Sequence, residues 1–367
     1  MKIALVHDWL NGMRGGEKCL EVLLEMMPHT PIFTLLCEPD KISEEIQRST
    51  ISTSWIQKLP FVKSKYRYFL PLFPWAIRNL NLKDCDLVIS ISHCAAKSVS
   101  LPRKAIHVCY CLTPMRYMWG FYDEYFGKGP YHWLKFLGLT LFLKRLQRWD
   151  QESSRRVDYF IAISQHVAKR IKNLYGRDSE VIYPPIDTAK FYYNDLDLKE
   201  DYFLIVSALV PYKRIDLAIR AFNQTGLPLK IIGAGTEFEK LKTLAGPNIQ
   251  FLGWVSNDLL RQYYARAQAL IFPGEEDFGI TPLEAQACGT PVIAFRKGGV
   301  LETVKEGETG LFFDDQTPNA LVQALEKFKG TPYDREALRQ NAFQFRTEIF
   351  QQKFKEFFRK NNISFNE

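Results

Sequence analysis

The sequence predicts two α/β domains, each built on a doubly wound and mostly parallel sheet. The chain of 367 residues is longer than a single hydrophobic core usually supports. Short Val- and Ile-rich segments alternate with helical ones in the first half, and the same alternation begins again near Asp201. Between the two halves lies YPPIDTAKF, whose prolines cannot continue a helix. A domain boundary is therefore expected there.

The expected strands of the first half are KIALVH, PIFTLL, DLVISIS, AIHVCY and DYFIAIS, and EKCLEVLLEMM is its first expected helix. The second half gives the strands YFLIVSAL, LKIIG, NIQFLG, ALIFP and PVIAF, with helices between them. We expect an N-terminal domain over residues 1–185 and a C-terminal domain over residues 186–340. A helical segment over residues 341–367 is expected to pack back toward the first domain.

The composition indicates a globular enzyme, with 46% hydrophobic and 24% charged residues. The start MKIALVHDW lacks the sections of a signal peptide, so a cytoplasmic location is expected. The seven cysteines have no CxxC spacing and are expected as buried free thiols. No zinc spacing and no DxD motif at a strand end is found, which predicts a mechanism without a metal or other cofactor.

The net charge of +7 is concentrated in residues 46–83, here called the basic aromatic segment, which contains no Asp or Glu. This mixture suits an anionic lipid surface, where each Lys or Arg adds about 1 kcal/mol. The alternative is a solvated positive face above a buried aromatic stripe. No nucleic-acid motif accompanies the segment, so nucleic acid is not expected as a partner. Its basic residues are Arg48, Lys58, Lys63, Lys65, Arg67, Arg78 and Lys83, and its aromatic residues include Trp55, Phe61, Tyr66, Tyr68, Phe69, Phe73 and Trp75.

A second apolar stretch, HWLKFLGLTLFLKRLQRW at residues 132–149, predicts a helix with a wide apolar face and a basic end. It is shorter than the about 20 apolar residues that cross a bilayer. Such a helix lies either on a membrane or in the core. Together with the basic aromatic segment it favours peripheral contact with the inner face of the plasma membrane.

The most specific motif is PGEEDFGITPLEAQACGTPVIAF, which follows the strand ALIF. Thr281 is expected as the N-cap of a helix, with Pro282 at the first helical position and Glu284 closing a capping box. Backbone amides of residues 278–280 would then be exposed at the positive end of the helix, where anions bind. Helix capping alone is the alternative explanation of Glu284.

Glu276 and Glu284, with seven residues between them, match the E-x7-E motif, and the chain resembles the retaining GT4 glycosyltransferases of group 1 type. The likeness continues through GTPVIAFRKGGVLETV and GETGLFF. It implies the GT-B fold, in which two Rossmann-like domains face a central cleft. By resemblance, Glu276 contacts the donor sugar and Glu284 accepts hydrogen bonds from ribose hydroxyls. The implied catalytic residues are Glu276, Lys213 and His93, and the implied donor-binding residues are Gly15, Gly16, Lys213, Val255, Phe278, Gly279, Ile280 and Glu284.

Gly15 and Gly16 precede a helix that is expected to start near Glu17, which would let backbone amides approach a diphosphate. A simple turn would also use two glycines. The spacing from the first strand does not fit GxGxxG, so a nicotinamide-binding domain is disfavoured.

The segment SALVPYKRIDLAI corresponds to a family segment in which an Arg and a Lys neutralise the donor diphosphate. Lys213 matches the lysine, the alternative being a solvated lysine at a helix start. Ala208 stands at the arginine position, so Arg214 or a residue of the first domain would have to supply that charge. Trp254 and Val255 are candidates for contact with the nucleotide base, and apolar packing is the alternative for Trp254.

In YCLTPMRYMW, Leu112 occupies the place where the similar mannosyltransferase-like branch has a histidine, and leucine forms no hydrogen bond with a sugar. His93, at a strand end in SISHCAAKSV, is a candidate for catalysis or a structural histidine. Arg116 is a candidate for phosphate or acceptor binding, with an ion pair as the alternative.

The resemblance implies a retaining hexosyltransferase with a nucleotide-diphosphate sugar as donor, GDP-mannose first and a UDP-sugar second. A lipid-linked or oligosaccharide acceptor in cell-surface polysaccharide synthesis is expected. Leu112 and Ala208 motivate one alternative, a catalytically impaired sugar-nucleotide-binding subunit. A GT-B sugar-nucleotide epimerase is another alternative. The oligomeric state is not determined by the sequence.

Overall fold

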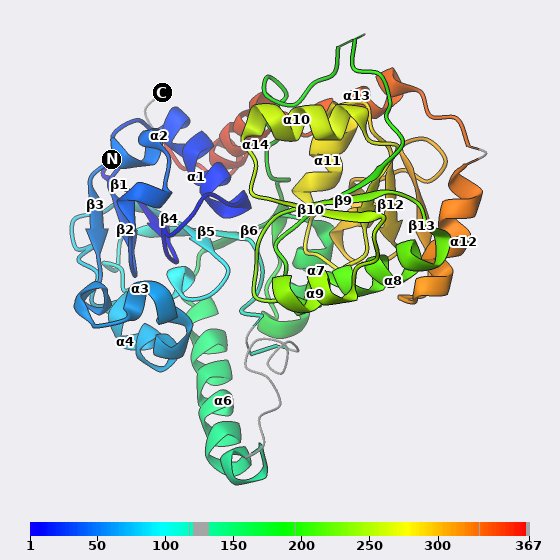
Figure 1. The fold of residues 1–367 in the computed structure, drawn as a ribbon. Helices are drawn as coiled ribbons and strands as arrows, with labels where there is room; N and C mark the ends of the chain where they lie inside the picture. Colours follow the sequence, from blue (N-terminus) through cyan, green and yellow to red (C-terminus); the bar gives the residue numbers. More distant parts are fainter. Residues whose placement is uncertain (117, 120–131, 195, 330, 365–367) are drawn as a thin grey trace. The chain divides into compact units, whose positions relative to one another are not determined.

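The protein forms two compact units, each with its own parallel sheet (Figure 1). The computed structural model describes residues 1–116, 118–119, 132–194, 196–329 and 331–364, without the side chains of residues 64 and 132–141. Unit 1 comprises Met1–Pro184 with Phe350–Glu367, and unit 2 comprises Pro185–Ile349. Both units are doubly wound and Rossmann-like, as the alternation of strand and helix signals predicted.

The sheet of unit 1 has the strand order β3-β2-β1-β4-β5-β6-β7, and all neighbouring strands run parallel. The order reverses at β1, where Leu5 lies opposite Ile32 on one side and Ile89 on the other. Its strands are β1 (Ile3–His7), β2 (Ile32–Thr34), β3 (Ile51–Thr53), β4 (Leu87–Ser92), β5 (Ile106–Cys111), β6 (Tyr159–Ala162) and β7 (Glu180–Val181).

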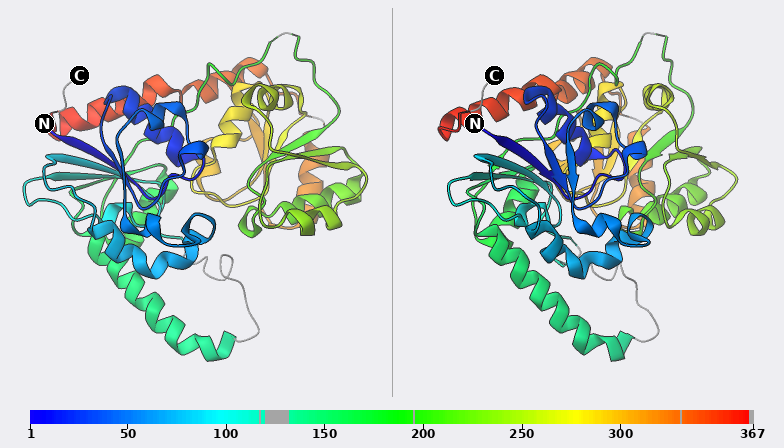
Figure 2. Two further views of the ribbon diagram at one scale, coloured as in Figure 1. Left: turned by 60° about the vertical axis from the view of Figure 1, so that its left-hand side comes forward. Right: turned by 90° about the vertical axis from the view of Figure 1, so that its left-hand side faces the viewer.

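Helices cover both faces of this sheet, so its central strands are almost wholly buried. Tyr110 of β5 contacts Cys19 of α1 and the rings of Phe350 and Phe354 of α14, so α1 and α14 share one face (Figure 2). The helices of unit 1 are α1 (Gly15–Met26), α2 (Glu44–Gln47), α3 (Val62–Lys65), α4 (Phe73–Arg78), α6 (His132–Ser154), α7 (Gln165–Tyr175) and α14 (Thr347–Lys360), with 3-10 turns at Pro39–Lys41, Trp55–Lys58, Tyr66–Leu72 and Ala96–Ser98.

The helix predicted over residues 132–149 is confirmed as α6, and its C-terminal part belongs to the core of unit 1. Leu146 is 3% exposed and packs in one apolar cluster with Trp9 and Val62. Asp150, fully buried, pairs with Lys97 and accepts hydrogen bonds from Trp119 Nε1 at 2.9 Å and Tyr175 Oη at 2.7 Å. The apolar side chains predicted at 132–141 lie outside the described residues. Within the described part of the chain, no helix is long and apolar enough to span a bilayer.

The sheet of unit 2 has the order β10-β9-β8-β11-β12-β13, again all parallel, and reverses at β8. In Figure 1, α8 and α9 cover one face and α10 and α11 the other. The strands are β8 (Phe203–Val206), β9 (Leu229–Ile232), β10 (Ile249–Gly253), β11 (Leu270–Phe272), β12 (Val292–Phe295) and β13 (Gly310–Phe313). The helices are α8 (Ile215–Thr225), α9 (Phe238–Leu244), α10 (Asn257–Arg266), α11 (Ile280–Ala287), α12 (Pro318–Phe328) and α13 (Arg335–Phe343), with 3-10 turns η5 (Pro211–Lys213) and η6 (Gly299–Glu302).

All seven cysteines are free thiols, and six of them are buried. Burial raises the pKa of Cys19 to about 12. Such thiols remain protonated and act as small apolar side chains.

Replacing Phe354 by alanine should lower the free energy of unfolding of unit 1 by about 3–5 kcal/mol, because the fully buried ring packs against Tyr110 and Phe350. Six of the seven tryptophans lie in unit 1, so urea unfolding followed by tryptophan fluorescence reports mainly on that unit. Gln352→Ala changes an exposed residue of the same helix and should cost less than about 0.5 kcal/mol. Equal effects of the two substitutions would contradict this packing.

Candidate functional site

Each sheet reverses its strand order beside its first strand, between β1 and β4 in unit 1 and between β8 and β11 in unit 2. In open parallel sheets, ligands bind outside the carboxyl ends of the strands at such a reversal. The segments that follow these four strands contain Asp8, His93, Lys213 and Glu276. Both reversal points therefore carry ionisable side chains.

In unit 2, the structure brings Lys213 and Glu276 together. Lys213 lies in η5 after β8, Glu276 lies in the loop after β11, and the lysine ammonium pairs with Glu276 Oε1. The side chain of Lys213 is only 14% exposed, so the alternative of a solvated lysine is wrong. The amide of Gly299 donates to the carbonyl of Glu276 at 2.8 Å, which ties the Glu276 loop to the GGVLE segment.

The predicted start of the helix after Glu276 is wrong. Helix α11 begins at Ile280, and its N-cap is Gly279 with φ of 91°, so Thr281 and Pro282 are its second and third residues and no capping box forms. A residue with a side chain would be strained at this φ, and its Cβ would lie 3.1 Å from Cζ of Phe272. Pro282 is tolerated because amides of the first turn have no partner within the helix.

Glu284 lies inside α11 rather than at its start, so helix capping does not explain it. It is 4% exposed, and its Oε2 accepts a hydrogen bond of 3.0 Å from the hydroxyl of Tyr264. Burial and the Glu284 carboxylate raise the pKa of Tyr264 well above its usual value, so this hydroxyl stays a donor. The hydrogen bond orients the carboxylate within unit 2.

The remaining predicted donor residues occupy the same edge of unit 2. Phe278 is buried and contacts the ring of Phe345, with centroids 5.8 Å apart. Val255 follows β10 beside Trp254, which is 82% exposed, so apolar packing of Trp254 is wrong. Their expected contacts with a nucleotide stay predictions.

Arg214 is not a ready replacement for the arginine that the family has at the position of Ala208, because its side chain already has partners. Its Nε lies 3.3 Å from Oδ1 of Asp216, and its guanidinium also donates to Gln316 at 2.9 Å. Ala208 itself is exposed in the segment after β8. The arginine side chain is thus held by partners on unit 2.

In unit 1, the carboxylate of Asp8 is fully buried and accepts four backbone hydrogen bonds of 2.5–2.9 Å from residues 93–96. His93 Nδ1 lies 3.0 Å from Asp8 Oδ2. Burial alone would raise the pKa of Asp8, but His93 and these hydrogen bonds hold it well below its usual value. Asp8 is a residue that the sequence interpretation missed, although it directly follows the first strand.

Asp8 fixes the orientation of the His93 ring. The ring also packs edge-on against Trp9, with centroids 4.5 Å apart. Nδ1 faces the buried carboxylate while 27% of the side chain is exposed, so the exposed edge is the one with Nε2. The ring is therefore positioned by its close approach to Asp8 and its packing on Trp9, with Nε2 at the accessible edge.

Gly15 and Gly16 are the first two residues of α1, and neither has a positive φ, so the simple-turn alternative is wrong. A Cβ on Gly16 would lie 2.7 Å from Leu112 Cδ1 and 3.2 Å from His7 Nε2. His7 is a second residue that the sequence interpretation missed. Burial lowers its pKa, and Nδ1 donates to the carbonyl of Trp9 at 2.9 Å. His7 and Leu112 therefore both border the space beside Gly16.

Arg116 is half-buried in the segment that follows β5, and its predicted contact with phosphate or acceptor stays a prediction. Tyr117 of the same TPMRY motif lies outside the described residues.

Two family models match the chain from residue 33 to residue 345. The model described as Glycosyl transferases group 1 matches residues 188–345, and the model described as Glycosyltransferase Family 4 matches residues 33–190. The chain belongs to glycosyltransferase family 4. The match over residues 188–345 falls within unit 2, where Lys213, Glu276 and Glu284 lie.

Curated relatives of this family 4 chain resemble about half of it. It is 32% identical over 190 residues to the D-inositol 3-phosphate glycosyltransferase of Acidothermus cellulolyticus, covering 43% of this chain and 42% of that protein. It is 29% identical over 206 residues to the GDP-mannose-dependent alpha-(1-6)-phosphatidylinositol monomannoside mannosyltransferase of Mycolicibacterium smegmatis, covering 48% and 54%. The chain spans about half the length of the curated relatives it matches.

Among solved structures, Anabaena HepE in complex with UDP is similar with a TM-score of 0.71 and 18% identity, covering 98% of this chain and 100% of that one. The likeness shows the GT-B fold.

Asp8 should make unit 1 sensitive to acid. Because its pKa is lower in the folded than in the unfolded state, it contributes stability above the ordinary Asp pKa of about 3.9, and this contribution is lost as the pH falls below that value. We expect the urea midpoint of unit 1, measured by tryptophan fluorescence, to fall as the pH is lowered from about 4 toward 2.

Asp8→Asn should weaken this acid dependence and destabilise unit 1 by about 3 kcal/mol at neutral pH, because the side-chain amide would turn an N–H toward backbone N–H groups. Asp84→Asn, at an exposed aspartate of the same unit, should keep the wild-type profile. A wild-type profile for Asp8→Asn as well would show that Asp8 is not a buried carboxylate.

Proposed function

We propose that this chain is a retaining hexosyltransferase that uses a nucleotide-diphosphate sugar and no metal. The observation that supports this most is the Lys213–Glu276 pair at the strand reversal of unit 2, beside the N-terminus of α11. A lysine and helix amides stabilise phosphate charge, and a carboxylate accepts hydrogen bonds from sugar hydroxyls. These are the groups that such a donor presents.

In the proposed complex, Lys213 turns to the diphosphate and neutralises the charge that grows on it as the sugar leaves. Glu276 then contacts the sugar. Glu284, oriented by Tyr264, accepts hydrogen bonds from the ribose hydroxyls. The amides of Gly279 and Ile280 approach the phosphates.

On the acceptor side, we assign His93 to an acceptor hydroxyl other than the attacking one, with Nε2 as the accepting atom. The departing phosphate oxygen takes the acceptor proton, so no enzymic nucleophile is needed. Leu112 is compatible with this route because no proton passes through it. Arg116, Gly15 and Gly16 are proposed to contact the acceptor or the phosphates from unit 1.

GDP-mannose is the proposed donor. The EDFGI and TPMRY segments and the similarity to a GDP-mannose-dependent mannosyltransferase support it. HepE was solved with UDP, so UDP-sugars are the competing donors to test. The proposed acceptor is a lipid-linked saccharide of cell-surface polysaccharide synthesis, reached from the cytoplasmic side of the membrane.

A donor-binding subunit without turnover is the second candidate. Ala208 and Leu112 lack the expected polar groups, and Arg214 is already held by Asp216 and Gln316. This candidate predicts nucleotide binding without release of a nucleotide diphosphate.

Membrane contact is proposed to occur through the basic aromatic segment. Phe61, Tyr68 and Trp75 are 74%, 75% and 69% exposed, whereas Tyr66 and Phe73 are buried, so the buried aromatic stripe explains only part of the segment. Lys63 and Lys65 are exposed beside Phe61. Aromatic rings at headgroup depth with lysines above them are typical of binding to anionic bilayers.

The backbone at Phe61 supports the same proposal. Phe61 adopts φ of 60°, a conformation that is strained for a residue with a bulky side chain. Strain and exposure both work against stability, and such positions cluster where a protein meets a ligand or surface.

Lys213→Ala should lower the rate of transfer by about 100- to 1,000-fold, because the leaving diphosphate loses its cation. Release of GDP from GDP-mannose, or of UDP from UDP-sugars, measures this in the presence of EDTA, after thermal-shift screening with GDP, UDP and ADP. Lys240→Ala is the matched control, because Lys240 is an exposed lysine of the same unit that also forms an ion pair, with Glu237. The Lys240→Ala protein should keep full activity.

Three outcomes of this assay count against the proposed transferase. Nucleotide binding without any turnover in the wild type would favour the donor-binding subunit. An altered nucleotide sugar without free diphosphate would favour an epimerase. Full activity of Lys213→Ala would remove Lys213 from the mechanism.

The double substitution Lys63→Gln and Lys65→Gln should weaken binding to phosphatidylglycerol vesicles by about 2 kcal/mol, or roughly 30-fold, in co-sedimentation. The matched control is Lys353→Gln with Arg359→Gln, two exposed cations of α14 in the same unit, which should bind as the wild type does. Phosphatidylcholine vesicles should bind all three proteins weakly. Equal binding of both doubly substituted proteins to anionic vesicles would contradict a role for the basic aromatic segment.

A further inference from the structure

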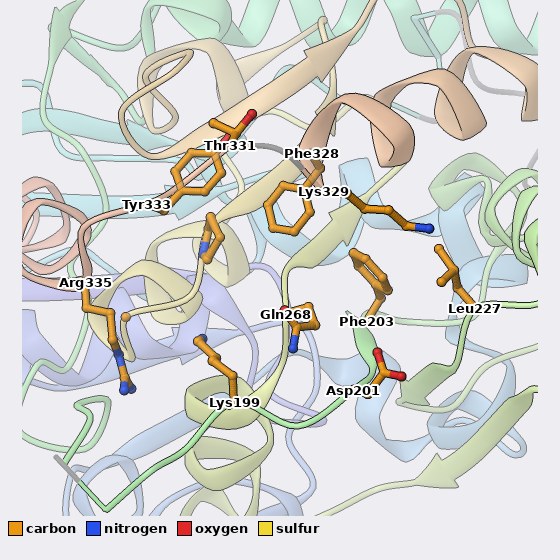
Figure 3. Close-up of a pocket in the computed structure, with 12 residues that line it drawn as sticks. Lys199, Asp201, Phe203, Leu227, Gln268, Phe328, Lys329, Thr331, Tyr333 and Arg335 are labelled. Carbon is orange, nitrogen blue, oxygen red and sulfur yellow. The ribbon is translucent and has the colours of Figure 1, made fainter.

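Unit 2 has a pocket at the edge of its sheet where the amino ends of the strands lie, whereas Lys213 and Glu276 follow the carboxyl ends. Figure 3 shows the residues that line it. Its volume is about 360 Å³. Asp201, Gln268 and Pro291 line it, and each stands just before the amino end of a strand, β8, β11 or β12. Residues between α12 and α13 form the other wall. This pocket therefore belongs neither to the proposed donor site nor to its carboxyl-end loops.

Two cations without a carboxylate partner lie on one side of the pocket. The ammonium of Lys199 donates to the Ala267 carbonyl at 2.8 Å and to Thr290 Oγ1 at 2.6 Å. Arg335 donates to the backbone carbonyls of Asp197 at 3.0 Å and Ala265 at 3.5 Å.

These partners are all uncharged groups. The Asp197 carboxylate is itself paired with Arg261 at 2.8 Å. Among the described residues, neither Lys199 nor Arg335 has an acidic oxygen within 4.0 Å.

The two cations are close enough to affect each other. Although much of the Lys199 side chain is exposed, its ammonium is enclosed, and this burial together with the charge of Arg335 lowers the pKa of Lys199 to about 7. Two neighbouring positive charges without a counter-charge favour the binding of an anion. Asp201 and Lys329 lie on the right of the pocket in Figure 3, away from Arg335, where their opposite charges balance.

An aromatic wall adjoins these cations. The rings of Tyr333 and Phe328 stack at 18° with centroids 5.5 Å apart, and both line the pocket. Figure 3 shows Tyr333 between Phe328 and Arg335. In the described part of the chain, the buried Tyr333 hydroxyl and Arg335 Nε have no hydrogen-bond partner. Buried polar groups are rarely left unpaired in a finished site.

We propose that this pocket binds a small organic anion in which a phosphate or carboxylate group is joined to a flat ring. The anionic group lies against Lys199 and Arg335, and the ring lies against Tyr333 and Phe328. The ammonium of Lys199 has three N–H donors and uses two of them within the protein, so one remains for the ligand.

The pocket is linked to Glu284 through three hydrogen bonds and the body of Tyr264, whose backbone carbonyl and side-chain hydroxyl take part in different ones. Lys199 donates to Thr290 Oγ1, Thr290 donates to the carbonyl of Tyr264 at 2.5 Å, and the Tyr264 hydroxyl donates to Glu284 at 3.0 Å. Thr290 follows the C-terminal end of α11, the helix that contains Glu284. An anion bound by the third N–H of Lys199 shifts the ammonium and alters its hydrogen bond to Thr290. This change alters the affinity for a nucleotide, a step that rests on the proposed function of Glu284.

Calorimetry with phenyl phosphate and with inorganic phosphate tests the site. Phenyl phosphate should bind the wild type more tightly than inorganic phosphate and should still bind in saturating GDP or UDP. Lys199→Met should lower the affinity for phenyl phosphate at least tenfold. Tyr333→Leu should lower the affinity for phenyl phosphate but not the affinity for inorganic phosphate. This substitution leaves the Lys199 hydrogen bonds intact. Lys327→Met, at an exposed lysine of α12, is the matched control and should bind as the wild type does.

The site is refuted if phenyl phosphate does not bind, if nucleotide displaces it, or if a folded Lys199→Met protein binds it with wild-type affinity. Circular dichroism melts establish that each variant is folded. If Lys199→Met does not fold, the Tyr333→Leu protein decides the test. Equal loss or no loss of affinity for phenyl phosphate and inorganic phosphate in that protein would then refute the site.

Coupling is tested by measuring the nucleotide Kd with and without saturating phenyl phosphate. In the wild type and in Thr290→Ser, which keeps the hydroxyl, the Kd should change by about fivefold or more, and in Thr290→Val it should stay constant. An unchanged Kd in the wild type would refute the coupling. A wild type that binds no nucleotide at all would refute the proposed donor site, while phenyl phosphate binding would still decide the pocket.

Discussion

Reversal of strand order in a fully covered parallel sheet is the constraint on which the rest of this structure depends. Helices on both faces leave the strand ends as the accessible places for polar groups, and at the reversal the chain leaves neighbouring strands toward opposite faces. Unit 1 places Asp8 and His93 there, and unit 2 places Lys213 and Glu276 there. The acidic residue follows the first strand of the sheet in unit 1 and the fourth strand in unit 2, so the same architecture arranges its charged groups differently in the two units.

Much of the fold could be predicted because long, buried parallel strands are continuous apolar segments in the sequence. The edge strands Ile51–Thr53 and Glu180–Val181 were missed because they are short and contain few apolar residues. The start of α11 was misplaced because Thr281, Pro282 and Glu284 imitate a capping box. The conformation of Gly279, which decides the start, depends on packing against Phe272 and has no local signal.

The residues of the candidate site could be predicted where they belong to a motif within one short segment. They could not be predicted where they depend on contacts between segments that are far apart in the sequence. Glu276, Glu284 and Lys213 came from the family resemblance, and His93 from its place at a strand end. Asp8 holds amides about 85 residues away along the chain, a pairing that no single segment reveals. Lys199 and Arg335 were missed for a related reason, since their partners are backbone carbonyls and a hydroxyl rather than charged residues that stand out in a sequence.

The packing of α14 has a consequence for the order in which the protein folds during synthesis. Phe350, Phe354 and Phe358 complete the core of unit 1, yet the ribosome adds them after all of unit 2. At typical elongation rates the chain of unit 2 takes roughly 10–30 s to make, and during that time the face of the unit 1 sheet around Tyr110 lacks the part of its cover that α14 supplies. Unit 2 can therefore finish folding before unit 1, although unit 1 is made first, and the uncovered apolar face is the surface that a chaperone would meet on the nascent chain.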